Sequence, residues 1–312
     1  MKDPKANDDS MLLPGDSPAA RRLRRAVVSA AGCRLPVLVH GESGSGKEGV
    51  ARAVHAWGPG REGSLVAVNC AALSESLLEA ELFGAARGAY TGCDRDRPGL
   101  LREAHGGTLL LDEVGEMSPG LQAKLLRFLD DGTVRPVGGV GQTKCDVRIV
   151  AATHRDLRPA RQKGGFRNDL WWRLAVVRIE VPPLRLRVPD LPAIVGVLAP
   201  RLEAECRRGP LELTAGAWQR LAEHRWPGNV RELRGVLARA LLAAHELPLS
   251  PEALLFDGSD PSREEIKGLE ERMIREALDA AGGHVGRTAA RIGWSRQKLY
   301  RRMHALGIRT CL

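Results

Sequence analysis

Short apolar runs alternate with longer segments of helical periodicity between residues 37 and 181. The runs at 37–39, 65–68, 109–111, 147–151 and 176–181 have the length and composition of buried strands. One intervening segment places Leu121, Leu125, Phe128 and Leu129 on a single helical face. This alternation is typical of a parallel sheet covered by helices, so we predict an α/β fold for residues 13–183.

Strand signals stop after the prolines at 182 and 183, and helical periodicity continues to about residue 247. The last helix of this stretch is expected to begin with a side-chain cap from Asn229, with Glu232 reaching back to the backbone. The same helix carries an apolar stripe formed by Val230, Leu233, Leu237 and Leu241. We therefore expect a helical lid at residues 184–247.

Shorter segments complete the chain. Residues 248–261 contain three prolines and a glycine and are interpreted as a linker rather than packed structure. Residues 262–312 begin with a Ser-x-x-Glu cap and form a third unit that is too small for an enzyme; its first helical face carries Ile266, Leu269, Met273 and Ala277. The polar residues 1–12 are expected to be disordered.

The charge of the chain indicates a nucleic-acid partner. The formal net charge is +9, and a surplus of this size favours a polyanionic partner where it is concentrated. From His284 onward there are seven Arg or Lys residues and neither Asp nor Glu. The C-terminal unit is therefore the candidate contact to double-stranded DNA.

Cysteine usage and hydropathy bear on the compartment. The six cysteines contain no CxxC pair, which argues against a zinc site and a disulfide framework and favours a reducing cytoplasm. The chain begins with polar residues, and its apolar runs are shorter than the roughly 18 residues of a membrane span. We predict neither a secretory signal nor a membrane partner.

A glycine-rich turn after the first predicted strand has the spacing of a phosphate-binding P-loop, formed by Gly41, Glu42, Ser43, Gly44, Ser45, Gly46 and Lys47. Backbone N–H groups can approach phosphates where glycine lacks a Cβ, and Lys47 is expected to pair with the β and γ phosphates of ATP. The next residue, Glu48, stands where the generic motif has a Ser or Thr hydroxyl for Mg²⁺. The metal must therefore rely on another carboxylate.

Two acids, Asp112 and Glu113, end a later apolar strand in the pattern called Walker B. Asp112 is the predicted Mg²⁺ ligand, and Glu113 is predicted to orient or deprotonate the attacking water. An exposed acidic turn after a core strand is the alternative, and the upstream P-loop makes it the weaker one.

Three motifs together resemble the central domain of the sigma-54-dependent activators, which belong to the AAA+ ATPases. They are residues 42–48, Glu-Leu-Phe-Gly at 81–84, and the hexapeptide Gly88, Ala89, Tyr90, Thr91, Gly92 and Cys93. The hexapeptide resembles the family's GAFTGA signature, which relatives carry on a loop that touches sigma-54 and responds to ATP hydrolysis. Tyr90 keeps an aromatic ring where the family has Phe, and Cys93 replaces the final Ala. A surface hairpin without a partner is the competing interpretation.

The same resemblance implies roles for residues around the nucleotide. Asn69 matches the residue that restrains the catalytic glutamate, with an ordinary strand-end asparagine as the alternative. Thr153 and His154 match the sensor I position, which is usually Thr-Asn, near the γ-phosphate. Arg231, in Trp-Pro-Gly-Asn-Val-Arg-Glu-Leu, matches the sensor II residue through which the lid contacts nucleotide.

A stretch that resembles the family's FREDLYYRL sequence contains Arg167 and Arg173. The resemblance makes both of them candidate arginine fingers, which reach the nucleotide of a neighbouring subunit. A guanidinium spreads positive charge across the phosphoryl oxygens, and a finger supplied in trans implies self-assembly into a ring, expected to be a hexamer. Two solvated arginines in a basic protein are the alternative.

Residues 283–308 resemble the Fis-type helix-turn-helix found at the end of such activators. Its first helix is expected to begin at Thr288, and its second helix is expected to turn Leu299, Met303 and Leu306 inward. The outward positions, which are the candidate contacts to phosphates or bases, are Arg296, Gln297, Lys298, Arg301 and Arg302. A solvated charged face is the competing interpretation.

These expectations combine into an activator that binds DNA upstream of promoters and uses ATP hydrolysis to remodel closed complexes of sigma-54 RNA polymerase. One alternative is a DNA-binding AAA+ regulator uncoupled from sigma-54; another is a P-loop remodelling ATPase, such as a helicase loader or a chelatase subunit, with another target. Fewer than about 15 residues precede the ATPase, too few for a sensory domain. We therefore expect control by a regulatory protein in trans, by expression level, or by a domain outside this sequence.

Overall fold

The computed structural model describes residues 12–90, 92–157, 164–244 and 247–256, together with 274, 277, 278, 281, 284–291, 299 and 303. The chain divides into two compact units, Met1–Leu255 and Phe256–Leu312. The N-terminal segment that we expect to be disordered lies outside the described residues except for Leu12, which packs against the core of the first unit.

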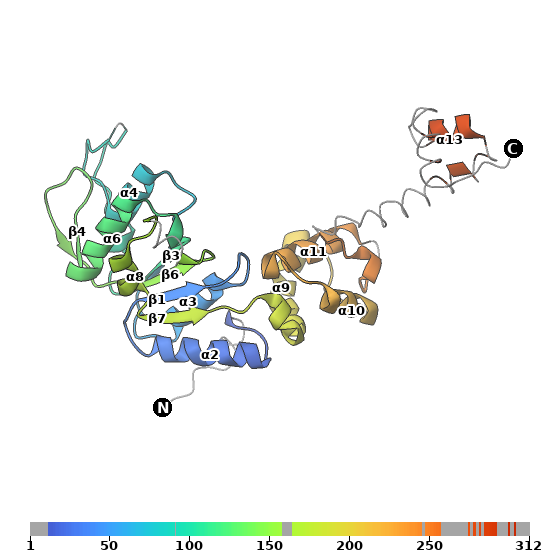
Figure 1. Cartoon of the computed structure of the whole chain (residues 1–312), viewed down its shortest axis with the longest axis horizontal. Helices are drawn as coiled ribbons and strands as arrows, with labels where there is room; N and C mark the ends of the chain where they lie inside the picture. Colours follow the sequence, from blue (N-terminus) through green and yellow to red (C-terminus); the bar gives the residue numbers. More distant parts are fainter. Residues whose placement is uncertain are drawn as a thin grey trace. The chain divides into compact units, whose positions relative to one another are not determined.

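A five-stranded parallel sheet forms the centre of the first unit, with the strand order β2-β3-β6-β1-β7 (Figure 1). Its strands are β1 (Val37–His40), β2 (Leu65–Asn69), β3 (Thr108–Asp112), β6 (Arg148–Thr153) and β7 (Val177–Glu180). Each predicted apolar run is one of these strands, so the prediction of an α/β fold with a parallel sheet is confirmed.

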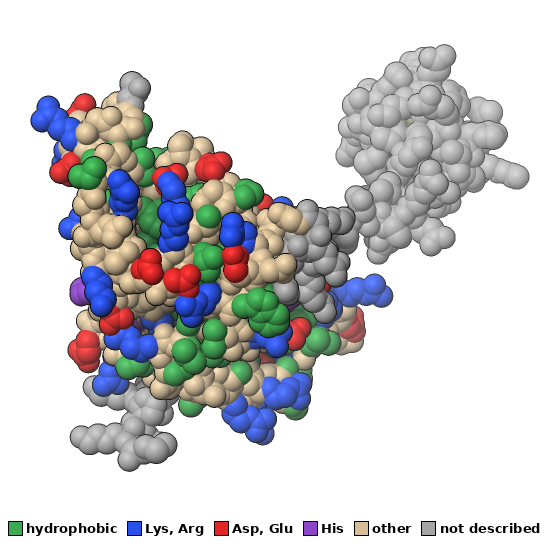
Figure 2. All heavy atoms as spheres, turned by 60° about the vertical axis from the view of Figure 1, so that its left-hand side comes forward, with side chains coloured by type: hydrophobic (Ala, Val, Ile, Leu, Met, Phe, Trp, Pro, Cys, Tyr) green, Lys and Arg blue, Asp and Glu red, His purple; other side chains and the backbone are tan. Residues whose placement is uncertain are grey.

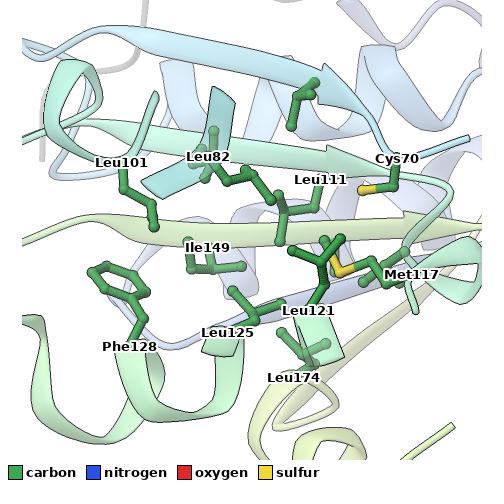
Figure 3. Packing of buried hydrophobic residues seen from close by; sticks show 14 of the residues in the cluster. Cys70, Leu82, Leu101, Leu111, Met117, Leu121, Leu125, Phe128, Ile149 and Leu174 are labelled. Atoms are coloured by element: carbon green, nitrogen blue, oxygen red, sulfur yellow. The ribbon is translucent and has the colours of Figure 1, made fainter. Parts of the chain in front are cut away.

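Alternate residues of the strands point to the two faces of the sheet, and each face has its own core. On one face Leu110 and Val150 pack with α2 (Pro18–Ala31) and α3 (Lys47–Ala56). On the other face Leu111 and Ile149 pack against α6 (Pro119–Asp131) and α8 (Asn168–Leu174), as Figure 3 shows. The predicted apolar face of α6 is confirmed, because it enters this core through Leu121, Leu125, Phe128 and Leu129.

Arg148, at the start of β6, is buried between the ends of two helices. Its Nη2 donates to the Ala30 carbonyl near the end of α2 at 2.6 Å, and its Nη1 donates to the Val54 carbonyl in the last turn of α3 at 3.2 Å. Burial lowers the pKa of the guanidinium. The carbonyls at a helix C-terminus lack partners within the helix and favour a cation, so Arg148 joins both helices to the sheet.

A second group of elements lies beyond the end of β2, comprising α4 (Glu75–Phe83), α5 (Leu100–Glu103), η1 (Val114–Glu116), and the antiparallel pair β4 (Thr133–Val134) and β5 (Thr143–Lys144). The β4–β5 hairpin is bonded to the segment after α4. Ala86 N–H donates to the Val137 carbonyl at 2.9 Å, and Val137 N–H donates to the Gly84 carbonyl at 2.8 Å. The loop between β4 and β5 and the segment that follows α4 are therefore hydrogen-bonded to each other.

The lid is helical, as predicted. It contains η2 (Leu184–Leu186), η3 (Val188–Asp190), α9 (Leu191–Cys206), α10 (Ala215–Glu223), α11 (Asn229–Ala243) and η4 (Pro251–Ala253). The expectation of an unpacked linker from residue 248 is wrong at its start. Leu249 N–H donates to the Glu212 carbonyl at 2.8 Å, and both Leu249 and Leu254 are buried. Two leucines among the prolines supply enough apolar surface to dock this segment on the lid.

Charged side chains of both signs are spread over the face of the first unit that Figure 2 shows. On the face in Figure 2, Lys and Arg side chains are interspersed with Asp and Glu and do not form a single basic stripe.

The second unit has a small core of its own, formed by Ile274, Leu278, Ala289, Leu299 and Met303. The inward orientation predicted for Leu299 and Met303 is confirmed, whereas Leu306 lies outside the described residues. Helix α13 (Val285–Arg291) begins three residues before the predicted start. Thr288 does not begin the helix but is buried within it, and its hydroxyl donates to the His284 carbonyl at 3.0 Å.

Candidate active site

The P-loop joins β1 to α3. Gly44 and Gly46 have φ values of 71° and 103°, in the left-handed region that glycine adopts without strain. Lys47 begins α3 and is buried, and its Nζ donates to the carbonyls of Gly41 at 3.1 Å and Glu42 at 3.3 Å. The loop therefore wraps around the lysine ammonium beside the free N–H groups of the helix start, which is an anion-binding arrangement.

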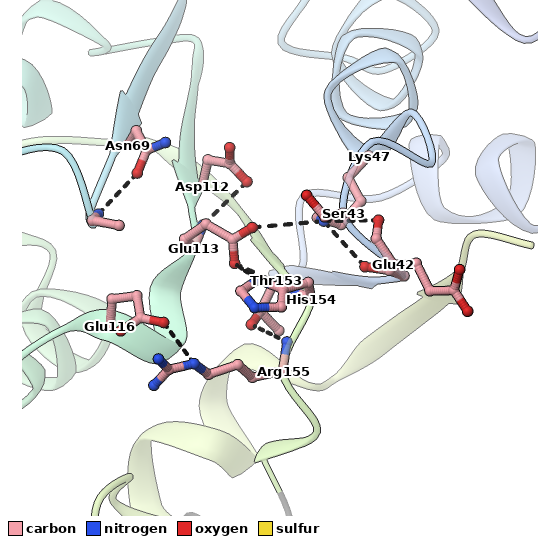
Figure 4. Close-up of polar contacts among 12 residues, drawn as sticks. Glu42, Ser43, Lys47, Asn69, Asp112, Glu113, Glu116, Thr153, His154 and Arg155 are labelled. Atoms are coloured by element: carbon pink, nitrogen blue, oxygen red, sulfur yellow. Dashed lines mark hydrogen bonds and ion pairs between the residues drawn. The ribbon is translucent and has the colours of Figure 1, made fainter. Parts of the chain in front are cut away.

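Asp112 and Glu113 stand at the carboxyl end of β3, opposite the P-loop (Figure 4). Burial raises the pKa of Asp112, and the charge of Glu113 adds to this effect. Glu113 has φ 54°, and its Oε1 lies 3.7 Å from Lys47 Nζ. Burial favours a higher pKa for Glu113, but hydrogen bonds from His154 and the charge of Lys47 outweigh it, so the pKa lies below its ordinary value. The site thus brings two acids and a buried ammonium together.

His154, directly after β6, is bonded to Glu113. Its Nδ1 lies 2.7 Å from Glu113 Oε2, and its backbone N–H donates to the same oxygen at 3.2 Å. Thr153 is engaged elsewhere, because its hydroxyl accepts the Arg155 N–H at 3.1 Å. Asn69 Oδ1 accepts the Ala71 N–H at 2.8 Å, and within the described residues no hydrogen bond joins Asn69 to Glu113. Of the residues that the resemblance places near the glutamate, His154 makes the direct contact.

The lid reaches the P-loop through the start of α11. Arg231, the sensor II candidate, donates from Nη1 to Ser43 Oγ at 2.7 Å, and Val230 N–H donates to the Gly44 carbonyl at 3.0 Å. A Cβ on Gly44 would lie 2.4 Å from the Gly228 carbonyl oxygen, so only glycine allows this approach. The P-loop and the lid are therefore in backbone contact.

Asn229 does not cap α11 as the sequence led us to expect. Its side chain is fully buried and connects three segments: Oδ1 accepts the Leu184 N–H at 2.8 Å, and Nδ2 donates to the Ser43 carbonyl and to Glu42 Oε2, both at 3.1 Å. Glu232 does reach back, accepting the Gly228 N–H at 2.7 Å. Asn229 was missed as a site residue because its partners lie far from it in the sequence.

A second polar link between the lid and the P-loop was also not predicted. Arg185 donates to both carboxylate oxygens of Glu42, at 2.5 and 2.7 Å. The hydrogen bonds from Arg185, and then from Asn229, lower the pKa of Glu42 to about 2. Arg187 is buried, and its Nη2 donates to the Ser45 carbonyl at 2.7 Å. With Arg231, four lid side chains therefore contact the P-loop.

A mostly apolar cavity of about 150 Å³ lies beside the P-loop, lined by Leu12, Leu13, Pro14, Leu23, Ser45, Gly46, Gly49, Val50, Val181, Arg187, Ile194, Val197, Leu198 and Val230. It is bounded by the N-terminal segment, α3 and the lid. Sequence reasoning did not find this cavity, because its walls come from four separate parts of the chain. Its position next to a phosphate site suits the flat apolar faces of a nucleotide base.

The structure does not bring Glu48 into the phosphate site. Its carboxylate accepts from Arg52 Nε at 3.1 Å and from Nη2 at 2.7 Å, on the exposed side of α3. Among the described residues, no group of three or more His, Cys, Asp or Glu side chains is placed to hold a metal on its own. An Mg²⁺ site here would therefore combine Asp112 with phosphate oxygens and water, which is the usual way Mg²⁺ is held.

Both arginine-finger candidates are exposed and paired with acids of the same chain. Arg167 donates to Asp169 at 2.7 and 3.0 Å, and Arg173 donates to Asp130 at 2.7 Å. Exposed pairs of this kind hold their partners weakly. Within the described residues, neither guanidinium is bonded to the P-loop of its own chain.

Backbone hydrogen bonds join the start of the hexapeptide at Gly88 to its end at Cys93. Gly88 N–H donates to the Cys93 carbonyl at 2.8 Å, and Cys93 N–H donates to the Tyr90 carbonyl at 3.0 Å. The Cys93 thiol is buried and packs with small residues that include Ala89, whereas Tyr90 remains 39% exposed. A small side chain is thus required at position 93, while the aromatic ring is presented outward. Thr91 lies outside the described residues, as do all five candidate DNA-binding residues.

A P-loop after a central parallel strand, an acidic pair on a nearby strand, and a helical lid bonded to the P-loop define an ATPase of the AAA+ class. Family models match along the chain: the Sigma-54 interaction domain over 13–180, the AAA+ ATPase lid domain over 185–268, and the Fis family of bacterial regulatory proteins over 266–306. The chain belongs to the family of sigma-54-dependent transcription regulators.

Individual relatives agree with this assignment. The transcriptional regulatory protein ZraR of Klebsiella oxytoca is 43% identical over 298 residues, which cover 92% of this chain and 67% of ZraR. The response regulator protein PilR of Pseudomonas aeruginosa is 39% identical over 325 residues, covering 99% of this chain and 73% of PilR. The crystal structure of NtrX from Brucella abortus superposes with a TM-score of 0.73 at 34% identity, covering 96% of this chain and 70% of NtrX. None of the described helices has the length and apolar character that a bilayer crossing requires.

Proposed function

We propose that this chain assembles into a ring, hydrolyses ATP at its subunit interfaces, and uses the motion to drive the Tyr90 loop against sigma-54, while the C-terminal unit holds the ring on DNA. The observation that carries the proposal is the placement of Glu113 beside Lys47, at the mouth of a P-loop that the lid also contacts. The match to the Sigma-54 interaction domain supports the choice of target.

In the proposed reaction, Lys47 and the P-loop N–H groups bind the phosphates, and the cavity beside Gly46 takes the base. Glu113 orients the attacking water and accepts its proton. Mg²⁺ would be held by Asp112 and would neutralise charge on the phosphate oxygens. A published structure of Brucella abortus NtrX is a complex with ATP, and it superposes on this chain with a TM-score of 0.71 at 33% identity, which supports the nucleotide assignment.

Arg167 and Arg173 are proposed to stabilise the phosphoryl group of the nucleotide bound to the neighbouring subunit. To do so, Arg167 would break its ion pair with Asp169, and Arg173 would break its ion pair with Asp130. This requirement for a neighbour is the reason for a ring, which we propose to be a hexamer. Arg231 is proposed to report the nucleotide state to the lid, because its guanidinium already rests on the P-loop hydroxyl of Ser43.

DNA binding is assigned to the C-terminal unit from residue 262 onward, through Arg296, Gln297, Lys298, Arg301 and Arg302. The match to the Fis family supports this assignment, and the buried Leu299 and Met303 have the four-residue spacing of inward positions on one helix. Binding is expected to weaken with salt in proportion to the number of phosphates contacted.

The test is transcription in vitro from a closed sigma-54 promoter and from a premelted one, with ATP, comparing the native chain with Glu113→Gln and Tyr90→Ala. We expect ATP-dependent product from the closed promoter with the native chain and none with either variant, while both variants still bind DNA. If Tyr90→Ala activates normally, the proposed contact is wrong. Intact ATPase activity and DNA binding of the native chain, without any transcript, would instead favour a regulator uncoupled from sigma-54.

A further inference from the structure

Both oxygens of the Glu113 carboxylate are engaged in the described structure (Figure 4). Oε1 faces Lys47 Nζ at 3.7 Å, and Oε2 faces two groups of His154, the ring Nδ1 at 2.7 Å and the backbone N–H at 3.2 Å. The Glu113 side chain is only 16% exposed. A carboxylate held in this way has little freedom to turn toward a water molecule.

A general base needs a free lone pair that points at the proton it removes. Hydrogen bonds to a carboxylate oxygen occupy its lone pairs and stabilise its charge, and both bonds from His154 fall on Oε2. The position seen here is therefore a resting position for the glutamate, and some contact must be released before it can accept a proton.

We propose that His154 is a positioning residue that restrains Glu113 before hydrolysis and releases it when the γ-phosphate of ATP is in place. The inference rests on the proposed role of Glu113 as the catalytic base. It gives His154 the restraint that the resemblance implies for Asn69, whose carboxamide is instead bonded to its own turn at Ala71. The restraint needs only an Nδ1–H donor, which one neutral tautomer of imidazole supplies.

The surroundings of His154 allow its side chain to move while its backbone stays in place. Thr153 ends the central strand β6 and is buried, and its hydroxyl fixes the following turn by accepting from Arg155 N–H. Arg155 is paired with Glu116 at 2.6 Å, so it does not compete for Glu113. The His154 side chain is 42% exposed and can rotate into solvent.

Two substitutions separate the hydrogen bond from the bulk of the ring. His154→Asn retains a nitrogen donor on Cγ, where the imidazole carries Nδ1, whereas His154→Leu removes the donor. ATP hydrolysis without sigma-54 is measured at chain concentrations where the rate per chain is constant. We expect kcat of His154→Leu to rise by about tenfold, the order expected for losing one charge-assisted hydrogen bond, with KM changed by less than about twofold. His154→Asn should stay within about twofold of the native kcat.

A kcat of His154→Leu that equals or falls below the native value overturns the proposal, because a residue that supports the reaction or the fold would give that result. A His154→Asn variant as fast as His154→Leu also overturns it, since the donor would then be irrelevant. The double variant Glu113→Gln/His154→Leu should not hydrolyse ATP. Native-like hydrolysis by Glu113→Gln alone would instead refute the proposed function, so the two failures are distinguishable.

A spectroscopic measurement follows the release of Glu113 in the native chain itself. The imidazole ¹⁵N resonances of the histidine-labelled full chain are recorded without nucleotide and with ADP and beryllium fluoride, and the His154 signal is assigned from its absence in His154→Asn. We expect the Nδ1 resonance to lose its carboxylate-bonded shift when the ATP mimic binds. An unchanged shift at saturating ligand refutes the release step. Asn69→Ala, the matched control, should leave the resting spectrum of His154 unaltered.

Discussion

Replacing Asn229 with alanine tests the link between the lid and the P-loop most directly. The change leaves the buried Leu184 N–H without its acceptor, which costs about 1–3 kcal/mol, and removes the bond to the Ser43 carbonyl, worth about 0.5–1.5 kcal/mol. Asn229 also has φ 54°, a left-handed conformation that asparagine tolerates better than alanine. We expect Asn229→Ala to lower the free energy of unfolding of the first unit by about 2–5 kcal/mol.

The assay is urea unfolding followed by circular dichroism, together with the Kd for ATP, which we expect to rise by about tenfold as the lid loosens. Asn229→Gly adopts the left-handed conformation without strain, so its free energy of unfolding should be about 1 kcal/mol higher than that of Asn229→Ala. Arg207→Ala is the matched control, because Arg207 is also left-handed, with φ 52°, but exposed, and we expect a change of at most about 0.5 kcal/mol. Equal effects of Asn229→Ala and Arg207→Ala, with an unaltered ATP Kd, would refute the reasoning.

Three further predictions concern single contacts. Arg148→Met should lower the unfolding free energy by about 2–4 kcal/mol in the same assay, because the Val54 carbonyl loses its bond to the guanidinium and the Ala30 carbonyl keeps only long contacts from Cys33; a neutral outcome would show that water replaces the guanidinium. Gly44→Ala should abolish tight ATP binding in a titration, since its Cβ would lie 2.4 Å from the Gly228 carbonyl oxygen, and a native Kd would contradict that clash. Because the folded pKa of Glu42 is lowered to about 2, its pair with Arg185 adds stability above the ordinary pKa and loses it as pH falls toward 2. Glu42→Gln should therefore lower the free energy of unfolding by less than about 1 kcal/mol at pH 7, and by the same amount at every pH between 6 and 8. A loss of stability that changes with pH in that range would have to come from a group other than Glu42.

Much of the nucleotide site could be predicted because its residues follow strands in fixed order. Apolar runs locate the strands, and the P-loop spacing and the pair Asp112 and Glu113 come directly after two of them. In a parallel sheet these carboxyl ends lie at one edge, so the sequence pattern alone brings the groups together. The fold class followed from the same runs.

The contacts that hold the site could not be predicted, because they depend on which distant segments meet. Asn229 has the sequence context of a helix cap, and only the folded chain shows that its partners are Leu184 and the P-loop. Arg148 is the one charged residue of the apolar run 147–151, and its burial depends on where two helices end. The prolines of residues 248–261 predicted a linker, but the buried side chains of Leu249 and Leu254 pack its first part against the lid.

Strand β6 connects the nucleotide site, which could be predicted, with the Arg148 contact, which could not. It begins at Arg148, fixed to the ends of α2 and α3, and it ends at Thr153, one residue before His154 and Glu113 meet. Paired on both sides within the sheet, this strand cannot shift at one end without shifting at the other. Small structural changes at the ends of α2 and α3 would therefore be transmitted along the six residues of β6 to the carboxylate of Glu113, and the end of the sheet at Arg148 becomes a place from which a ligand could tune ATP turnover.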